Sequence, residues 1–243
     1  YYGCIIMSSS VVDETEQTET TPGMDFSVPW TFYLMRLFTD ERSETDVRNT
    51  YLMSYPRTNG NGGNSSILPT AAGIAACGGR IYILDSPPKW SGYEGFEYTR
   101  KVLVEEYGVL SNQIEPVPFL QDGSKMVHTR NEAHSVISFF ASKGIEDFGV
   151  LGTPYHLPRA YLTFVATLIN DEGKLPRMYP VVGKGMGAWY GGNGLHHSQN
   201  SFMENACDCI EEEVKRVKIY HEKGDVASVR EALQYLKYCT TSK

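Results

Sequence analysis

The residues best suited to chemistry lie in the segment Gly152-Thr-Pro-Tyr-His-Leu-Pro-Arg159, a tight turn between an expected strand and an expected helix. Histidine titrates near neutral pH and can act as a general acid or base, and arginine can bind phosphate or carboxylate through two parallel hydrogen bonds. A single histidine in a turn is most often a hydrogen-bonded surface residue. The crowding of Tyr155, His156 and Arg159 at one helix start, just after Thr153, favours a functional role for this turn.

A second polar cluster, Thr129-Arg-Asn-Glu132, precedes an apolar stripe and predicts another helix start. Its spacing fits a capping box, in which Thr129 accepts a hydrogen bond from a first-turn amide and Glu132 reaches back to the cap. Capping is sufficient to explain Thr129 and Glu132, and an arginine in a first turn is usually solvated. The alternative is that these residues, Arg130 and Asn131 included, contribute to a ligand site.

Both clusters need a fold that brings them together, and the chain alternates strand and helix patterns that supply one. Strands are expected at residues 51–55, 81–85, 114–119, 148–151 and 178–182, and helices over 67–77, 93–107, 129–143 and 157–170. The pattern predicts an α/β fold with about five mostly parallel strands and helices on both faces of the sheet. Such sheets bind ligands beyond the carboxyl ends of their strands, where helix N-termini attract anions.

The sequence divides into three parts. Residues 1–49 are expected to form an N-terminal extension and linker, residues 50–182 the α/β domain, and residues 183–243 a glycine-rich loop and a helical hairpin. Capping residues at Ser201–Glu204 and Asp225 predict where the two hairpin helices begin. The hairpin either packs on the domain or provides the contact surface of a homo-oligomer or complex. Residues 1–7 are either an ordinary strand or the end of a signal or anchor segment, so the compartment stays open.

Composition argues against several classes of function. The chain has 29 acidic and 22 basic residues and a formal charge of −7, which disfavours nucleic acid as the partner. Cys207 and Cys209 lie two residues apart in an expected helix and point to different sides, so no metal site is expected. The glycines after residue 183 occupy the place where a dinucleotide fold needs a helix, which argues against NAD and leaves the cofactor unknown. No segment has the about 20 consecutive apolar residues that span a membrane.

Two motifs in the centre of the chain resemble a known family. Residues 151–160, LGTPYHLPRA, resemble the V-T-S-x-Y-H-x-x-R-A turn of the bacterial α/β domains that include the YdcF, SanA and ElyC proteins. Residues 128–133, HTRNEA, resemble the E-N-A-like helix start of that family, with two polar residues exchanged. The resemblance covers roughly residues 50–182, although the first loop and the end of the second strand depart from the family pattern.

This resemblance implies a Rossmann-like three-layer sandwich. It also implies nucleotide-like ligands and a link to bacterial envelope and polysaccharide metabolism, although the family has no established general reaction. Glu94 or Glu97 would correspond to the acidic residue that the family carries after its second strand.

The leading hypothesis is a site for a phosphorylated or nucleotide-like small molecule in a divergent member of this family. His156 would act as general acid or base, and Glu94 or Glu97 would orient it or bind a sugar hydroxyl. The residues assigned to ligand binding are Thr129, Arg130, Asn131, Glu132, Thr153, Tyr155 and Arg159, with the two arginines as an anion clamp. The alternative is a non-catalytic binding or assembly subunit. A metal-dependent phosphohydrolase is disfavoured, because no strand end carries paired aspartates.

Overall fold

The fold is built on one parallel sheet of five strands. The computed structural model describes residues 30, 33–34, 48–53, 64–86, 95–120, 128–169, 175–183, 195–196, 202–203 and 206–241. The strands of the sheet are β1 (Asn49–Leu52), β2 (Arg80–Asp85), β3 (Ile114–Pro118), β4 (Asp147–Gly152) and β5 (Arg177–Val182), in the order β3-β2-β1-β4-β5. All four neighbouring pairs are parallel, which confirms the predicted α/β class and sharpens "mostly parallel" to fully parallel.

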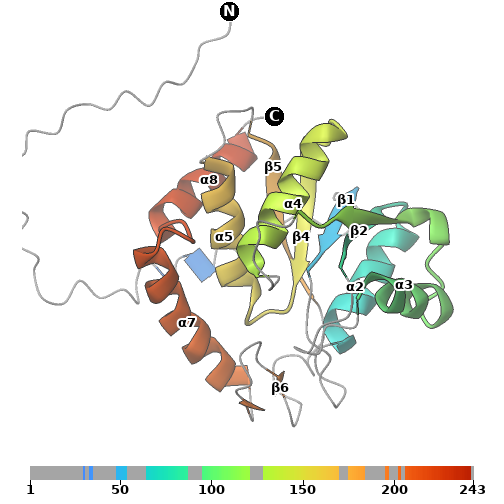
Figure 1. The fold of residues 1–243 in the computed structure, drawn as a ribbon, viewed down its shortest axis with the longest axis horizontal. Helices are drawn as coiled ribbons and strands as arrows, with labels where there is room; N and C mark the ends of the chain where they lie inside the picture. The colour runs from blue at the N-terminus through green and yellow to red at the C-terminus, as the bar shows by residue number, and fades with distance from the viewer. Residues whose placement is uncertain are drawn as a thin grey trace, which may run out of the picture.

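Helices cover both faces of the sheet (Figure 1). On one face lie α2 (Asn64–Ala76) and α3 (Phe96–Glu105), and on the other lie α4 (Thr129–Ser142) and α5 (Leu157–Ile169). Side chains alternate along each strand, so Tyr51 of β1 and Met53 just after it enter the core under α4 and α5, whereas Leu52 enters the core under α2. The result is the Rossmann-like three-layer sandwich that the sequence predicts.

The strand boundaries and edges follow from local sequence. The two prolines of β3 predict an edge position, and β3 is an edge strand that pairs with β2 alone. The first strand covers Asn49–Leu52 rather than residues 51–55, so its prediction is displaced toward the C-terminus. The expected helix stops at Gly108 and Gly144 are correct, because both glycines adopt the positive φ that ends a helix, 69° and 67°.

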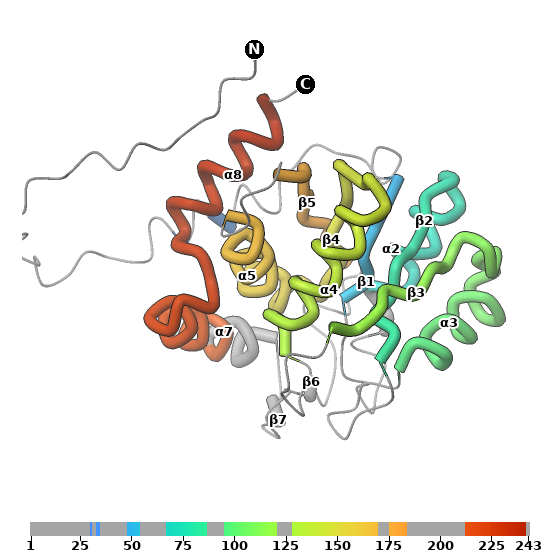
Figure 2. Tube along the Cα trace, turned by 45° about the horizontal axis from the view of Figure 1, so that its top comes forward, coloured from blue at the N-terminus to red at the C-terminus, as the bar shows by residue number. Residues whose placement is uncertain are grey.

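The order of the strands reverses between β1 and β4. The chain runs outward from β1 through β2 to β3, returns to β4 beside β1, and continues outward to β5 (Figure 2). The helices that follow β3 and β4 therefore both begin at the carboxyl edge of the sheet, next to this reversal. In open parallel sheets that reversal is the usual place for a ligand, because the loops on its two sides lead away in opposite directions.

The C-terminal hairpin forms a fourth layer. Its helices, α7 (Ala206–Glu222) and α8 (Val229–Thr241), pack against α5, and the Ala227 amide donates to the Leu162 carbonyl at 3.0 Å. Because α5 lies between the sheet and this hairpin, all its residues from Leu157 to Leu168 are buried. Of the two expected positions for the hairpin, the structure shows packing on the domain.

Both expected starts of the hairpin helices are wrong. Residues Phe202–Met203 form β7, which pairs with β6 (Leu195–His196), and α7 begins at Ala206 instead of after Ser201. The second helix is capped by Ser228, three residues after the expected Asp225. Ser228 and Glu231 form a capping box, in which the Ser228 amide donates to Glu231 at 2.6 Å and the Glu231 amide donates to the Ser228 hydroxyl at 3.2 Å. Asp225 forms an ion pair instead, as shown below.

Three helical residues of the N-terminal part, Trp30, Tyr33 and Leu34, pack against the same core as α5. The Tyr33 hydroxyl donates to the Pro158 carbonyl at 2.8 Å, which ties this segment to the first turn of α5. The rest of the predicted extension and linker, and the glycine-rich loop between Gly183 and residue 195, lie outside the described residues. No helix among the described residues is long and apolar enough to cross a membrane.

Thr50 on β1 generates a stability prediction. Its side chain is buried, and its hydroxyl has no hydrogen-bond partner among the residues that the structure describes. Thr50→Val keeps the β-branched shape and removes this unsatisfied group, so we expect the free energy of unfolding in urea to rise by about 1 kcal/mol. The control is Thr99→Val, which removes a hydroxyl bonded to the Gly95 carbonyl at 3.0 Å and should lower that free energy. Equal losses in both variants would contradict the assignment of Thr50.

Tyr235 generates a prediction for alkaline pH. Its hydroxyl donates to the Pro176 carbonyl at 2.5 Å and accepts from the Met178 amide at 3.1 Å, joining α8 to β5. Burial raises the pKa of Tyr235 well above its ordinary value of 10.0. The folded state therefore holds this proton more tightly than the unfolded state does. Its contribution to stability is complete below pH 10 and is lost as the pH rises from there toward the folded-state pKa.

We expect the free energy of unfolding to fall with rising pH above about 10, measured by urea denaturation at a series of pH values. Tyr235→Phe should be less stable at neutral pH, because it loses two hydrogen bonds, and its stability should decline less steeply in alkali. An identical decline in the wild type and the variant would show that Tyr235 does not carry this effect.

Candidate functional site

The two polar clusters of the sequence meet at the carboxyl edge of the sheet. The guanidinium of Arg159, in the first turn of α5, lies with Nη1 3.5 Å from Oγ1 of Thr129, the first residue of α4. The N-termini of α4 and α5 are therefore side by side, next to the reversal of strand order between β1 and β4. Sequence reasoning placed these clusters at one edge of the sheet, and the structure brings them into contact.

The turn that leads into α5 is held by its own backbone. The Thr153 carbonyl accepts hydrogen bonds from the amides of His156 at 3.1 Å and Leu157 at 2.9 Å, and the Thr153 side chain is buried. Gly152 precedes this turn, and a Cβ added there would lie 3.2 Å from the Met53 sulfur, a tight contact that the Met53 side chain would have to relieve. Tyr155 and His156 are half-buried at the surface of the turn.

The start of α4 differs from the predicted capping box. The N-cap is His128, whose Nδ1 accepts a hydrogen bond from the Asn131 amide at 3.4 Å, and Thr129 is the first helical residue. The helix thus begins one residue earlier than the Thr-x-x-Glu pattern indicates, which moves Glu132 one position deeper. There the Glu132 carboxylate is buried and accepts a 2.5 Å hydrogen bond from the hydroxyl of Tyr51 on β1.

The strongest interaction at the site is an ion pair that the sequence did not indicate. Nε of Arg159 lies 2.5 Å from Oε2 of Glu213 on α7, and Nη2 of Arg159 lies 3.4 Å from Oε1. Both residues are buried, with 7% of Arg159 and 2% of Glu213 exposed. The Arg159 guanidinium also lies 5.5 Å from the ring centroid of Tyr220, further along α7. The predicted anion clamp at Arg159 is therefore already occupied by a carboxylate of the hairpin.

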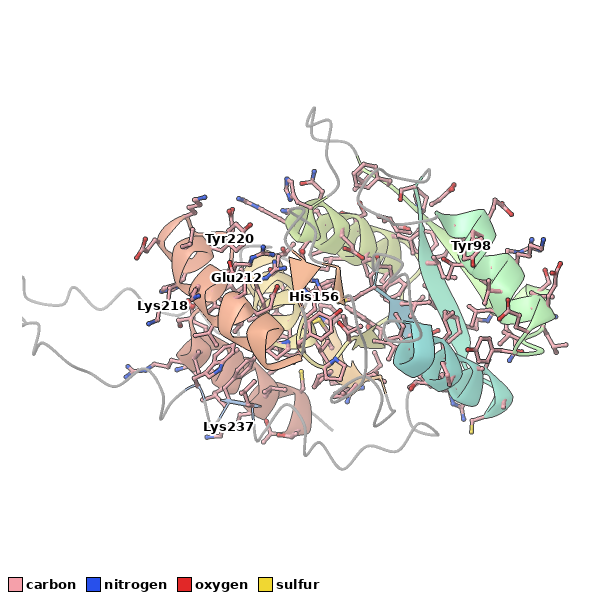
Figure 3. The ribbon with its side chains drawn as sticks, turned by 90° about the horizontal axis from the view of Figure 1, so that it is seen from below. Tyr98, His156, Glu212, Lys218, Tyr220 and Lys237 are labelled. Atoms are coloured by element: carbon pink, nitrogen blue, oxygen red, sulfur yellow. The ribbon has the colours of Figure 1, made fainter. Side chains whose placement is uncertain are left out.

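His156 lies beside this pair, and Figure 3 labels it next to α7, which carries the labelled Glu212 and Tyr220. Its Nδ1 is 3.0 Å from Nη2 of Arg159 and 3.5 Å from Oε2 of Glu213. The two contacts require opposite states of Nδ1, because a guanidinium only donates and a carboxylate only accepts. Because a guanidinium can only donate, the 3.0 Å contact is a hydrogen bond in the tautomer that carries its proton on Nε2. With 21% of its side chain exposed, His156 lies at the edge of the buried cluster.

A second arginine shares the same carboxylate. Nη1 of Arg216 lies 3.6 Å from Oε1 of Glu213, and Nε of Arg216 lies 3.7 Å from Oε1 of the partly exposed Glu212. Sequence reasoning missed Glu213 and Arg216 because it followed only the apolar stripe of α7. A signal was present, however: positions 213, 216 and 220 recur at helical spacing beside Val217, so they share its inward face.

The remaining predicted residues do not join the cluster. Arg130 is half-exposed and forms a 2.6 Å ion pair with Asp225, in the turn between α7 and α8. Glu97 is exposed on α3 beside Arg100, across the sheet from His156; Figure 3 shows its neighbour Tyr98 far from His156. The expectation that Glu97 orients His156 is therefore wrong, and the carboxylate next to His156 is Glu213. Glu94 lies outside the described residues.

Two further features bear on the choice of site. A hollow of about 440 Å³ lies on the outer surface of α3, between Glu97, Lys101 and Ser111. Its charged side chains pair within α3, and it lies away from both helix starts, so it is not the site assigned here. Among the described residues, no group of three or more His, Cys, Asp or Glu side chains is arranged to hold a metal ion.

The chain matches no family model, no curated protein and no solved structure. The likeness of residues 128–133 and 151–160 to the YdcF, SanA and ElyC family therefore remains a prediction from sequence. The fold and the contacts at the carboxyl edge of the sheet carry the functional argument.

The buried pair makes a stability prediction. Glu213→Gln leaves two buried guanidinium groups without their shared carboxylate, and breaking a buried ion pair in this way costs about 3–5 kcal/mol. We expect that loss in the free energy of unfolding measured by urea denaturation. Glu212→Gln on the same helix is the matched control and should change stability by less than about 1 kcal/mol, because Glu212 is 32% exposed. Similar small effects in both variants would show that Glu213 does not anchor the hairpin.

Proposed function

We propose that the protein binds a phosphorylated or nucleotide-like small molecule at the carboxyl edge of its sheet, where α4 and α5 begin. The observation that carries this proposal is the 3.5 Å contact between Arg159 and Thr129, which joins the two helix starts beside the reversal of strand order. Each helix start adds positive potential and first-turn amides that lack acceptors within their own helix. Two such starts side by side favour a ligand that carries negative charge.

The side chains around the two helix starts suit the polar parts of such a ligand. Thr129 offers a half-buried hydroxyl, and His156 offers the proton on Nε2 as a hydrogen-bond donor. Arg159 contacts Nδ1 of His156 at 3.0 Å and so orients the ring, much as a catalytic histidine is oriented by a neighbouring charged group. If the protein is an enzyme, His156 is the group that would transfer a proton to or from the ligand. The resemblance implies envelope or polysaccharide metabolism as the setting.

The alternative function, a non-catalytic assembly subunit, relied on the hairpin as a free contact surface. The inner face of the hairpin instead packs on its own domain through Glu213, Asp225 and the apolar residues of α8. An assembly role would therefore have to use the outer face, on which Ile219 is 49% exposed. The small-molecule site does not need this surface, so we favour it over assembly.

Isothermal titration calorimetry of the whole chain with inorganic phosphate, pyrophosphate and a nucleoside diphosphate tests this proposal. We expect at least one of the three to bind, and His156→Ala to weaken that binding about tenfold, the effect of losing about 1.4 kcal/mol of interaction. His134→Ala is the matched control, since His134 lies exposed on α4 and should leave the affinity unchanged. Failure of all three compounds to bind the wild-type protein would overturn the proposal. Equal weakening by His134→Ala would remove His156 from the site.

A further inference from the structure

Ser86 is a buried side chain whose hydroxyl has no hydrogen-bond partner within the part of the chain that the structure describes. Only 3% of the residue is exposed, and it directly follows Asp85, the last residue of β2. A hydroxyl can donate one hydrogen bond and accept two, so burying it without any is costly. Thr50 shares this property but lies inside the sheet, whereas Ser86 lies at the carboxyl edge, where ligands bind.

The strands on both sides of β2 place Ser86 beside the first two turns of α4. On one side, the Tyr51 hydroxyl of β1 donates to Oε1 of Glu132 at 2.5 Å. On the other side, the Leu120 amide, two residues after β3, donates to the Ser135 hydroxyl at 3.0 Å. Because β2 lies between β1 and β3, its carboxyl end lies against the same stretch of α4.

The alternation of side chains along β2 puts Ser86 on the α4 side of the sheet. Tyr82 and Leu84 enter the core cluster beneath α4 and α5, whereas Ile83 enters the cluster on the other face. The alternation continues past the end of the strand, since Asp85 is exposed and Ser86 is buried. The Ser86 hydroxyl is therefore directed toward the start of α4 and away from α2.

The polar groups near Ser86 favour a hydroxyl of the ligand over a phosphate group. The first two turns of α4 carry three buried polar side chains, Asn131, Glu132 and Ser135. A carboxylate repels a phosphate group strongly where water is excluded, but it accepts a hydrogen bond from a hydroxyl. A ligand hydroxyl can also donate to Ser86 or accept from it. The surroundings of Ser86 therefore suit an uncharged group that carries O–H bonds.

The site then has two parts, one on each side of the start of α4. Toward α5 lie Thr129, His156 and Arg159, the residues around the proposed phosphate position. Toward β2 lies Ser86. Since β1 separates β2 from β4, the two parts are two strand spacings apart, about 10 Å. A nucleotide or a phosphorylated sugar has a phosphate group at one end and hydroxyls several bonds away, and so can bridge them.

We propose that Ser86 binds a sugar hydroxyl of the phosphorylated ligand, and that the site therefore selects nucleotides or phosphorylated sugars over inorganic phosphates. This inference rests on the proposed function and deepens it, since it names the part of the ligand that contacts the end of β2. Ser86 is a specificity-determining residue in this assignment, and the phosphate stays with the two helix starts.

Calorimetric titration of the whole chain with three compounds tests this inference. The compounds are pyrophosphate, adenosine diphosphate and 2′,3′-dideoxyadenosine diphosphate, which lacks both sugar hydroxyls. We expect the wild-type protein to bind adenosine diphosphate about threefold to tenfold more tightly than its dideoxy analogue, the usual effect of one hydrogen bond. Ser86→Ala should abolish this difference and leave the affinity for pyrophosphate unchanged, because it removes only the contact with the sugar.

Ser142→Ala is the matched control, since Ser142 is an exposed serine at the other end of α4 and its variant should keep the full difference. Urea denaturation supplies a second measurement. Ser86→Ala should be at least as stable as the wild-type protein, because it removes a buried hydroxyl without a partner among the described residues. A clear loss of stability would show that the hydroxyl has a structural partner, such as an ordered water, and would overturn the inference.

The outcomes separate this inference from the proposed function. Equal affinities of the wild-type protein for adenosine diphosphate and its dideoxy analogue would overturn the role of Ser86 and leave the phosphate site at the helix starts intact. A difference that persists in Ser86→Ala would do the same. Absence of binding to every phosphate compound would overturn both.

Discussion

The buried ion pair between Arg159 and Glu213 is the interaction on which the arrangement of the site depends. It joins the first turn of α5 to the middle of α7, and so connects the α/β sandwich to its added fourth layer. Removing two charges from water is unfavourable unless geometry and further hydrogen bonds compensate. Here Arg159 gains contacts with His156 and Thr129 as well, so one side chain orients the histidine and spaces the two helix starts.

The apolar packing makes this ion pair possible. Because α5 is buried on every side, the groups at its first turn are shielded from water by the sheet, by α4 and by the hairpin. Shielding strengthens the charged contacts and also raises the cost of any buried donor without an acceptor.

The sequence predicted the sheet well because its strands are short apolar runs separated by helices with clear stops. The proline-rich edge strand β3 and the glycines at 108 and 144 each act locally, so their effect can be inferred without knowledge of the fold. Helix starts were harder. Thr129 and Glu132 have the spacing of a capping box, but His128 takes the cap, and the buried Tyr51 draws Glu132 inward.

The site itself was predicted only in part. The contact between residues 129 and 159 follows from the parallel sheet, whereas the partners of Arg159 and Arg130 lie 54 and 95 positions away in the hairpin. Such pairings depend on how the hairpin docks, and a local pattern carries no information about that. Charged residues on the inner face of α7 were the available clue, since a charge at an apolar position implies a buried partner.

The most direct test of the site at the two helix starts is a crystal structure of the whole protein soaked with tungstate, a phosphate analogue whose position is given by anomalous scattering. The account predicts a peak at the carboxyl edge of the sheet, between the starts of α4 and α5. A peak confined to the hollow on α3, or no peak at the carboxyl edge, would contradict it.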